Sequence, residues 1–151
     1  MSQSLSAVYV HLVFSTKLRQ PFFRDEGVGE ELHAYLGGIA RQLGCPPIRI
    51  GGAEDHVHVL ASLGRTITLA EWVKELKRVS TLWLKERGRK WHDFQWQGGY
   101  AAFSVSQSNL AQVAEYVATQ EEHHRKLSFE DELRALLRKH NIVFDERHLW
   151  D

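Results

Sequence analysis

The chain has 151 residues, 43% of them apolar and 25% charged, a composition typical of soluble globular proteins, and its length predicts one domain over residues 1–151. No apolar run approaches the ~20 residues of a membrane span, and a single cysteine, Cys45, excludes an internal disulfide. Because the N-terminus also lacks a signal-peptide pattern, we expect a cytoplasmic protein.

The 19 basic and 19 acidic residues cancel, so the chain lacks the overall positive charge of many nucleic-acid-binding proteins. The charge is nevertheless unevenly distributed. Residues 65–90 hold eight basic and three acidic residues, and residues 1–24 hold three basic residues and no acid. This distribution predicts a basic surface. Runs of charged residues also occur on ordinary solvent-exposed helix faces.

The first half of the chain contains signals for three strands and a helix. Alternating apolar residues predict a strand over residues 7–15. Apolar residues at helical spacing predict a helix over residues 28–43, which Gly44 would end. Residues 48–50 and 56–63, joined by a glycine-containing loop, predict a β-hairpin.

The second half is mostly helical in pattern. A capping box at residues 68–71 begins a second predicted helix, and residues 94–106 are expected to be extended. A third helix is expected from about Asn109 to Lys126, and Ser128 is expected to cap a last one. The order strand, helix, strand, strand, helix, strand predicts an α+β fold of the ferredoxin-like, split βαβ type, with a central antiparallel sheet and additional C-terminal helices.

His56 and His58 form a candidate metal site. They are two positions apart in a predicted strand, so their side chains point to the same side, and Val57 and Val59 point to the other. We expect the apolar side to pack under the two helices and the histidine side to be the open face of the sheet. His11 of the first strand would join that face, because the first and third strands of this fold are neighbours. A half-exposed structural strand would show the same pattern.

Tyr116 and Gln120 are four positions apart in the predicted third helix, so they project from one face, with His124 one turn further. Such a tyrosine also occurs as an ordinary packing residue where a helix meets a sheet. Beside a metal site, however, the phenol becomes a candidate nucleophile. His123 and His124 are adjacent, so their side chains should diverge rather than form a ligand pair.

The chain resembles, over nearly its whole length, the single-tyrosine HUH transposases of the insertion sequence 200/605 type. The His-x-His motif alone is a weak signal, but four segments occur in the family's order. They are YVHLVFSTK at 9–17, EDHVH at 54–58, WQGGYAAFSVS at 96–106 and YVATQEEHH at 116–124.

This resemblance implies a single HUH transposase domain in which His56, His58 and Gln120 bind Mg²⁺ or Mn²⁺ and Tyr116 is the nucleophile. It implies cutting and rejoining of single-stranded DNA at hairpin-bearing element ends, through a 5′-phosphotyrosine and a free 3′-hydroxyl. Three neutral ligands would leave a divalent ion its full charge. The resemblance also implies a homodimer with active sites in trans, in which Tyr116 of one subunit serves the histidines of the other.

The basic surface then becomes the expected DNA contact. The residues expected to contact DNA lie in two basic segments: Lys17, Arg19, Lys74, Arg78, Arg87, Arg89 and Lys90.

Three other functions fit the same sequence. They are a domesticated single-stranded DNA-binding family member, an HUH replication or conjugation nickase, and a non-catalytic ferredoxin-like binding module. The presence of Tyr116 and of all three implied ligands favours an active enzyme.

Overall fold

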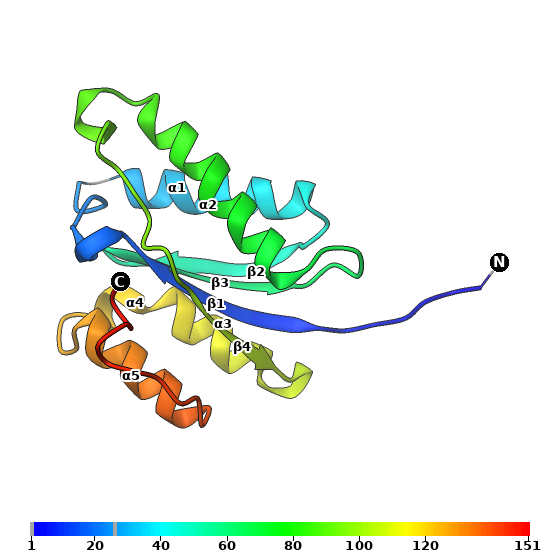
Figure 1. Cartoon of the computed structure of the whole chain (residues 1–151). Coiled ribbons are helices and arrows are strands. Elements are labelled where there is room, and N and C mark those ends of the chain that lie inside the picture. The colour runs from blue at the N-terminus through cyan, green and yellow to red at the C-terminus, as the bar shows by residue number, and fades with distance from the viewer. Residues whose placement is uncertain (1, 26) are drawn as a thin grey trace.

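A computed structural model describes residues 2–25 and 27–151. Four strands form one antiparallel sheet in the order β2-β3-β1-β4 (Figure 1). This confirms the predicted fold class, with the first and third strands as neighbours at the centre. The bounds of the strands are β1 Tyr9–Ser15, β2 Pro47–Gly52, β3 His56–Ser62 and β4 Ala101–Val105.

The last strand is shorter than predicted. Residues 94–106 were expected to be extended, but only Ala101–Val105 pair continuously with β1, and Trp96 makes a single bridge to Thr16. Glycines weaken strands, and Gly98 and Gly99 lie between the two paired parts. Here the ammonium of Lys77 donates to the carbonyl oxygens of residues 97 and 99, at 2.7 and 2.8 Å.

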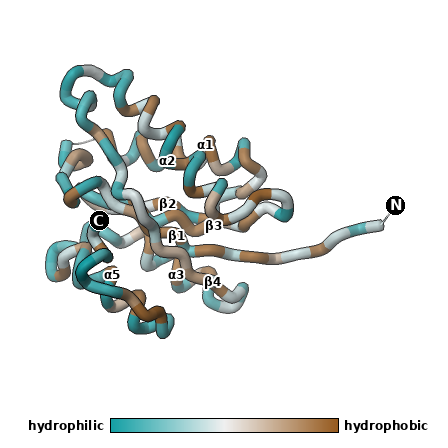
Figure 2. Tube along the Cα trace, in the orientation of Figure 1, coloured by the Kyte–Doolittle hydropathy of each residue, from teal (hydrophilic) through white to brown (hydrophobic). Residues whose placement is uncertain are grey.

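Helices α1 (Val28–Gln42) and α2 (Leu69–Lys85) cover one face of the sheet, as predicted (Figure 1). The predicted cap of α2 is present, because the Thr68 hydroxyl accepts a hydrogen bond from the backbone N–H of Glu71 at 3.1 Å. Hydrophobic positions are concentrated along the central strands, and the loop after α2 is hydrophilic (Figure 2). The core residues of this layer include Leu12, Phe14, Val57, Val59, Leu36, Trp72 and Leu76.

The opposite face of the sheet is not open, so that prediction is wrong. Helices α3 (Leu110–Ala118), α4 (Gln120–His123) and α5 (Phe129–Lys139) cover it (Figure 1), and His56 and His58 have no exposed surface. An amphipathic helix must bury its apolar stripe, and α5 does so here. The resulting second core contains Val13, Phe103, Phe129, Leu133, Leu136 and Leu137.

The predicted third helix is two helices. Thr119 interrupts it with φ −107° and ψ 29°, between the end of α3 and the start of α4. The Thr119 hydroxyl donates to the carbonyl oxygen of Glu115 at 2.9 Å, and such side-chain bonds to the previous turn often bend helices. Tyr116 and Gln120 therefore lie on either side of a break, but the Gln120 amide still reaches the Tyr116 carbonyl oxygen at 3.2 Å.

The C-terminal residues hold α5 in place. Arg134 of α5 donates to both carboxylate oxygens of Glu146, at 2.5 and 3.2 Å. The Trp150 ring lies 5.2 Å from the guanidinium carbons of both Arg19 and Arg134. The Gln97 amide donates to the Leu149 carbonyl oxygen at 2.9 Å. These contacts connect α5 to the loop after β1 and to the segment before β4. Within residues 2–25 and 27–151, no helix combines the length and hydropathy needed to cross a membrane.

The covered face predicts a large stability effect at Leu133, which is only 7% exposed. Leu133→Ala should lower the free energy of unfolding by about 2–4 kcal/mol, because it opens a cavity between α5 and the sheet. Urea unfolding measures this loss. The matched control is Leu82→Ala, at a leucine that is 55% exposed, which should change stability by about 0.5 kcal/mol or less. Equal small effects at both positions would contradict a packed α5.

Candidate active site

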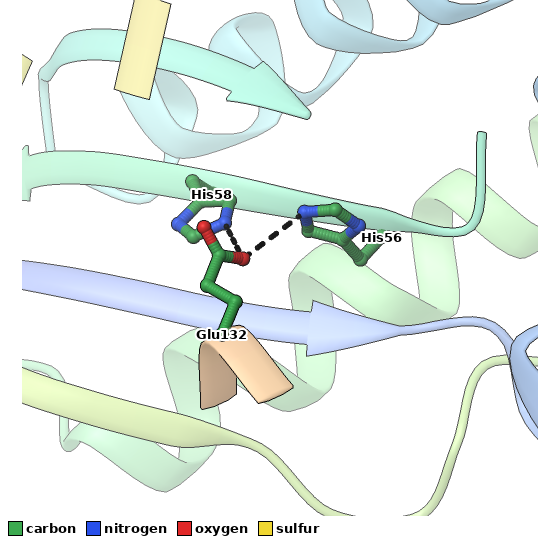
Figure 3. A group of neighbouring side chains, drawn as sticks. All are labelled: His56, His58 and Glu132. Carbon is green, nitrogen blue, oxygen red and sulfur yellow. Dashed lines mark hydrogen bonds and ion pairs between the residues drawn. The ribbon is translucent and has the colours of Figure 1, made fainter. Parts of the chain in front are cut away.

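Three buried side chains converge beneath β3. His56 and His58 point from β3 toward α5, where the carboxylate of Glu132 lies between them (Figure 3). The Nε2 atoms of His58 and His56 are 3.1 and 3.5 Å from Glu132 Oε1. Glu132 is only 1% exposed, so a charged carboxylate lies in the interior beside two imidazoles.

Gln120 and His124 complete the cluster. Gln120 Oε1 is 3.0 Å from His56 Nε2 and 3.0 Å from His124 Nε2. His124 Nε2 is also 3.1 Å from Glu132 Oε1. His123 diverges from this group, as its adjacent position predicted, and stacks on the Tyr116 ring with centroids 4.8 Å apart.

Tyr116 lies against the same carboxylate. Its hydroxyl donates to Glu132 Oε2, and its ring packs edge-on to His58 with centroids 5.8 Å apart. The structure thus brings together all four residues that the sequence pointed to for the reaction, Tyr116, His56, His58 and Gln120. They meet within one chain, because α3 packs on β2 and β3 of its own sheet. The trans site that the resemblance implies would require α3 to pack on the sheet of a partner subunit.

The distances fit a shared ion. Ligand atoms about 2.1 Å from one metal ion lie roughly 3.0–3.4 Å from each other. The contacts of His56 and His58 with Gln120 and Glu132 span 3.0–3.5 Å. Two imidazole nitrogens with two oxygens form a donor set that suits Mn²⁺ or a similar divalent ion. The predicted ligands were all neutral, whereas this cluster also contains the carboxylate of Glu132.

The electrostatics of the cluster favour neutral His58 and His11 near an ionised Glu132. Burial lowers the pKa of His58 to about 4, and burial lowers the pKa of His11 to about 3. Burial alone would raise the pKa of Glu132, but hydrogen bonds with His124 and His58 outweigh it and hold that pKa well below its usual range. Burial and the charge of Glu132 raise the pKa of Tyr116 above its usual value, so the phenol is protonated.

Glu132 was missed by the sequence analysis. Acidic residues in the first turn of a helix are common because they interact favourably with its dipole, and Glu130, Asp131 and Glu132 all occupy that turn. One signal was available. Phe129 and Leu133 belong to the apolar stripe of α5, and position 132 is three residues after the first and next to the second. An acidic residue at the edge of a buried apolar stripe is unusual and indicates that its carboxylate has a polar partner elsewhere in the fold.

Most residues expected to contact DNA lie apart from this cluster, and only Arg19 among them lines the cleft beside it. Lys74 and Arg78 are exposed on α2, on the opposite side of the sheet, and line a groove of about 650 Å³ between α2 and residues 94–100. In the loop after α2, Arg87 donates to Glu31 at 2.5 Å and Lys90 pairs with Asp25. Arg89 and Lys17 are exposed, and Arg19 lies 3.7 Å from Glu130.

Comparisons with known proteins point to one family. The family described as "Transposase IS200 like" matches residues 4–120. The ISDra2 transposase TnpA of Deinococcus radiodurans is 29% identical over 115 residues, which cover 73% of this chain and 81% of that protein. A crystal structure of a Deinococcus radiodurans R1 protein assigned as a transposase has a TM-score of 0.61 and 26% identity, covering 78% of this chain and 95% of that one.

A second solved structure shares the fold. It is a REP-associated tyrosine transposase bound to a REP hairpin, with a TM-score of 0.55 and 11% identity over 78% of this chain and 70% of that one.

The buried imidazoles predict acid sensitivity of the metal-free protein. His11, His33 and His58 have pKa values lowered to about 3, 4 and 4, mainly by burial, so the unfolded chain binds more protons below pH ~6.5. The free energy of unfolding should therefore fall as the pH drops from about 6.5 to 4, measured by urea titration at each pH. His33→Gln should make this slope shallower, whereas the exposed His92→Gln should leave it unchanged. Parallel slopes in all three proteins would contradict the assignment for His33.

Proposed function

This chain belongs to the IS200-like transposase family, and from that premise we propose that it cuts and rejoins single-stranded DNA at hairpin-bearing element ends, with Tyr116 as the nucleophile. The observation that carries the proposal is a shared contact. The Tyr116 hydroxyl and the Nε2 atoms of His56 and His58 meet at one carboxylate, Glu132. A candidate nucleophile therefore lies directly beside a candidate metal site.

The proposed reaction is a transesterification. The Tyr116 hydroxyl loses its proton to solvent as its oxygen attacks the phosphorus, the bond from phosphorus to the 3′ oxygen breaks, and the leaving 3′ oxygen takes up a proton from solvent. The product is a 5′-phosphotyrosine and a free 3′-hydroxyl. Because the new ester conserves the broken bond's energy, attack by another 3′-hydroxyl rejoins the DNA without a nucleotide cofactor.

His56, His58, Gln120 and Glu132 would hold the divalent ion, Mg²⁺ or Mn²⁺. When bound, such an ion polarises the phosphoryl oxygen and favours the phenolate form of a nearby tyrosine. Glu132 has a second role in this arrangement, since its other oxygen accepts the Tyr116 hydroxyl proton in a hydrogen bond and so orients the phenol. His124 donates to the oxygens of both Gln120 and Glu132 and keeps them aimed at the histidines.

The contacts within one chain favour a site built in cis. α3 lies on its own sheet, and Tyr116 reaches Glu132 of the same chain. The homodimer with trans sites implied by the sequence resemblance is the alternative arrangement, and it would require α3 to be exchanged between subunits.

The groove along α2 is the proposed path for the DNA backbone. Lys74, Lys77, Arg78 and Lys85 line it together with Tyr100, which is 43% exposed, and none of the described residues in the lining is acidic. Basic residues beside an exposed aromatic ring suit a strand whose phosphates and bases both need contacts. Arg78 and Lys74 pair with Glu75 and Glu71 of the same helix, and Arg87 and Lys90 also pair with acids. Arg87 and Lys90 do not line the groove, so their contribution should be smaller.

Tyr116→Phe tests the nucleophile. It removes only the hydroxyl, so the variant should bind labelled single-stranded DNA from the flanks of this gene but form no covalent adduct in a denaturing gel. The matched control is Tyr35→Phe, because Tyr35 stacks on Trp83 far from the cluster. The wild type and this control should form the adduct equally. An adduct of normal yield with Tyr116→Phe would overturn the assignment.

Complementation distinguishes the cis site from the trans site. Tyr116→Phe and His58→Ala proteins should each be inactive, and a mixture that has exchanged subunits should stay inactive, because neither chain owns a complete cis site. Cleavage of the labelled DNA is the readout, and a mixture of wild type with His58→Ala is the positive control. Recovered cleavage in the variant mixture would establish the trans arrangement instead.

Charge removal tests the groove. Replacing Lys74, Arg78 and Lys85 by glutamine should weaken DNA binding and lower the slope of log affinity against log salt by about 0.7 for each phosphate that the protein no longer neutralises. Fluorescence anisotropy at several salt concentrations measures both quantities. The control, of equal charge change, replaces Arg87, Arg89 and Lys90 and should have the smaller effect. The reverse order would place the DNA on the loop after α2.

A further inference from the structure

Each of the two histidines beneath β3 is held on its far nitrogen. His56 Nδ1 is 2.8 Å from Asp55 Oδ1, and His58 Nδ1 is 2.7 Å from His11 Nε2. Neither Asp55 nor His11 has a place in the proposed reaction. Both contacts direct the Nε2 atoms toward Gln120 and Glu132, at 3.0 Å for His56 and 3.1 Å for His58.

Asp55 fixes the tautomer of His56. An ionised carboxylate only accepts hydrogen bonds, so the proton of neutral His56 must lie on Nδ1, and the lone pair on Nε2 is available to an ion. The negative charge also makes the imidazole a stronger ligand. Asp55 is itself anchored, because its carbonyl oxygen accepts from the backbone N–H and the hydroxyl of Thr16, at 2.9 and 3.2 Å.

His11 holds His58 in a different way. A neutral His58 that offers Nε2 to an ion carries its proton on Nδ1 and donates it to His11 Nε2. His11 is 4% exposed, and its ring is confined between His58, Phe103 and Tyr116, with centroids 5.0, 5.9 and 6.0 Å away. This acceptor is uncharged and immobile, so it orients His58 without adding charge.

We propose that Asp55 and His11 are positioning residues for a divalent ion at His56 and His58, Asp55 through charge and orientation and His11 through orientation alone. This inference rests on the proposed function, since it presupposes the ion. It adds that the two histidines are unequal ligands, and that His11 of the first strand belongs to the site without touching the ion.

The test is metal binding by the full chain without DNA. Mn²⁺ affinity is measured from the electron paramagnetic resonance signal of the free ion, and the visible spectrum of bound Co²⁺ reports the ligand geometry. Asp55→Ala and His11→Phe should each weaken Mn²⁺ binding roughly 10- to 100-fold. Asp55→Asn keeps an acceptor oxygen and loses the charge, so its affinity should lie between those of Asp55→Ala and the wild type. His11→Gln supplies a neutral acceptor and should recover most of the affinity. The control is His92→Ala, at an exposed histidine outside the cluster.

The outcomes separate the inference from the function. The positioning roles would be overturned, without affecting the proposed metal site, if all four variants kept the Mn²⁺ affinity and the Co²⁺ spectrum of the wild type. These variants are Asp55→Asn, Asp55→Ala, His11→Gln and His11→Phe. If the wild type binds no Mn²⁺, or if a double variant of His56→Ala with His58→Ala binds it undiminished, both the metal site and this inference fail. Should Asp55→Ala or His11→Phe not fold, the conservative variants decide. In that case, Asp55→Asn that binds Mn²⁺ as tightly as the wild type would overturn the charge role of Asp55. His11→Gln that binds Mn²⁺ weakly but keeps the wild-type Co²⁺ spectrum would overturn the orienting role of His11.

Discussion

The buried carboxylate of Glu132 makes the contacts on which the layer of α3, α4 and α5 against the sheet depends. Its oxygens contact His56, His58, His124 and Tyr116, side chains that come from β3, α3 and the residues after α4. A charge in the interior is costly unless it is paired and hydrogen-bonded, and burial favours the neutral form of His58 beside it. A cation at this point would compensate the charge more fully than a neutral imidazole does. The packing of α5, and the C-terminal residues that hold it, therefore position the carboxylate that links the proposed metal site to the proposed nucleophile.

Sequence patterns predicted most of the helices and strands, but they did not predict which of them pack against each other. Alternation in β1 and β3 predicted which residues share a face, so His11 was correctly placed on the face of His56 and His58. The sheet order followed from the order of strands and helices. The partner of the histidine face was misjudged, because the apolar stripe of α5 shows that the helix must pack but not on which surface. Glu132 was hidden for the same reason, since its importance arises from a contact with residues more than seventy positions away.

The charges near the cluster and near the groove have opposite consequences for DNA. A cleft beside the cluster, which Asp55 and His124 help to line, carries more acids than bases. The charged residues of its lining are Arg19, Arg24 and Arg125 against Glu30, Glu54, Asp55, Glu121 and Glu130. Such a rim attracts cations and repels phosphates. In the proposed function, general attraction for the strand would come from the groove on α2, and binding of the phosphate at the cluster would depend on the ion. The neutral net charge of the chain is consistent with this division.

The contact between Tyr116 and Glu132 also makes the reactivity of the phenol depend on the ion. Without a cation, burial and the carboxylate charge raise the pKa of Tyr116, so the group that should attack DNA stays protonated. Two unit charges about 4 Å apart at an effective dielectric constant of about 20 interact by roughly 4 kcal/mol, which corresponds to about three pKa units. A divalent ion on Glu132 would change the local charge from −1 to +1, and this interaction would then lower the pKa instead of raising it. In the proposed function, the residues that would hold the ion therefore keep Tyr116 protonated until the ion is bound.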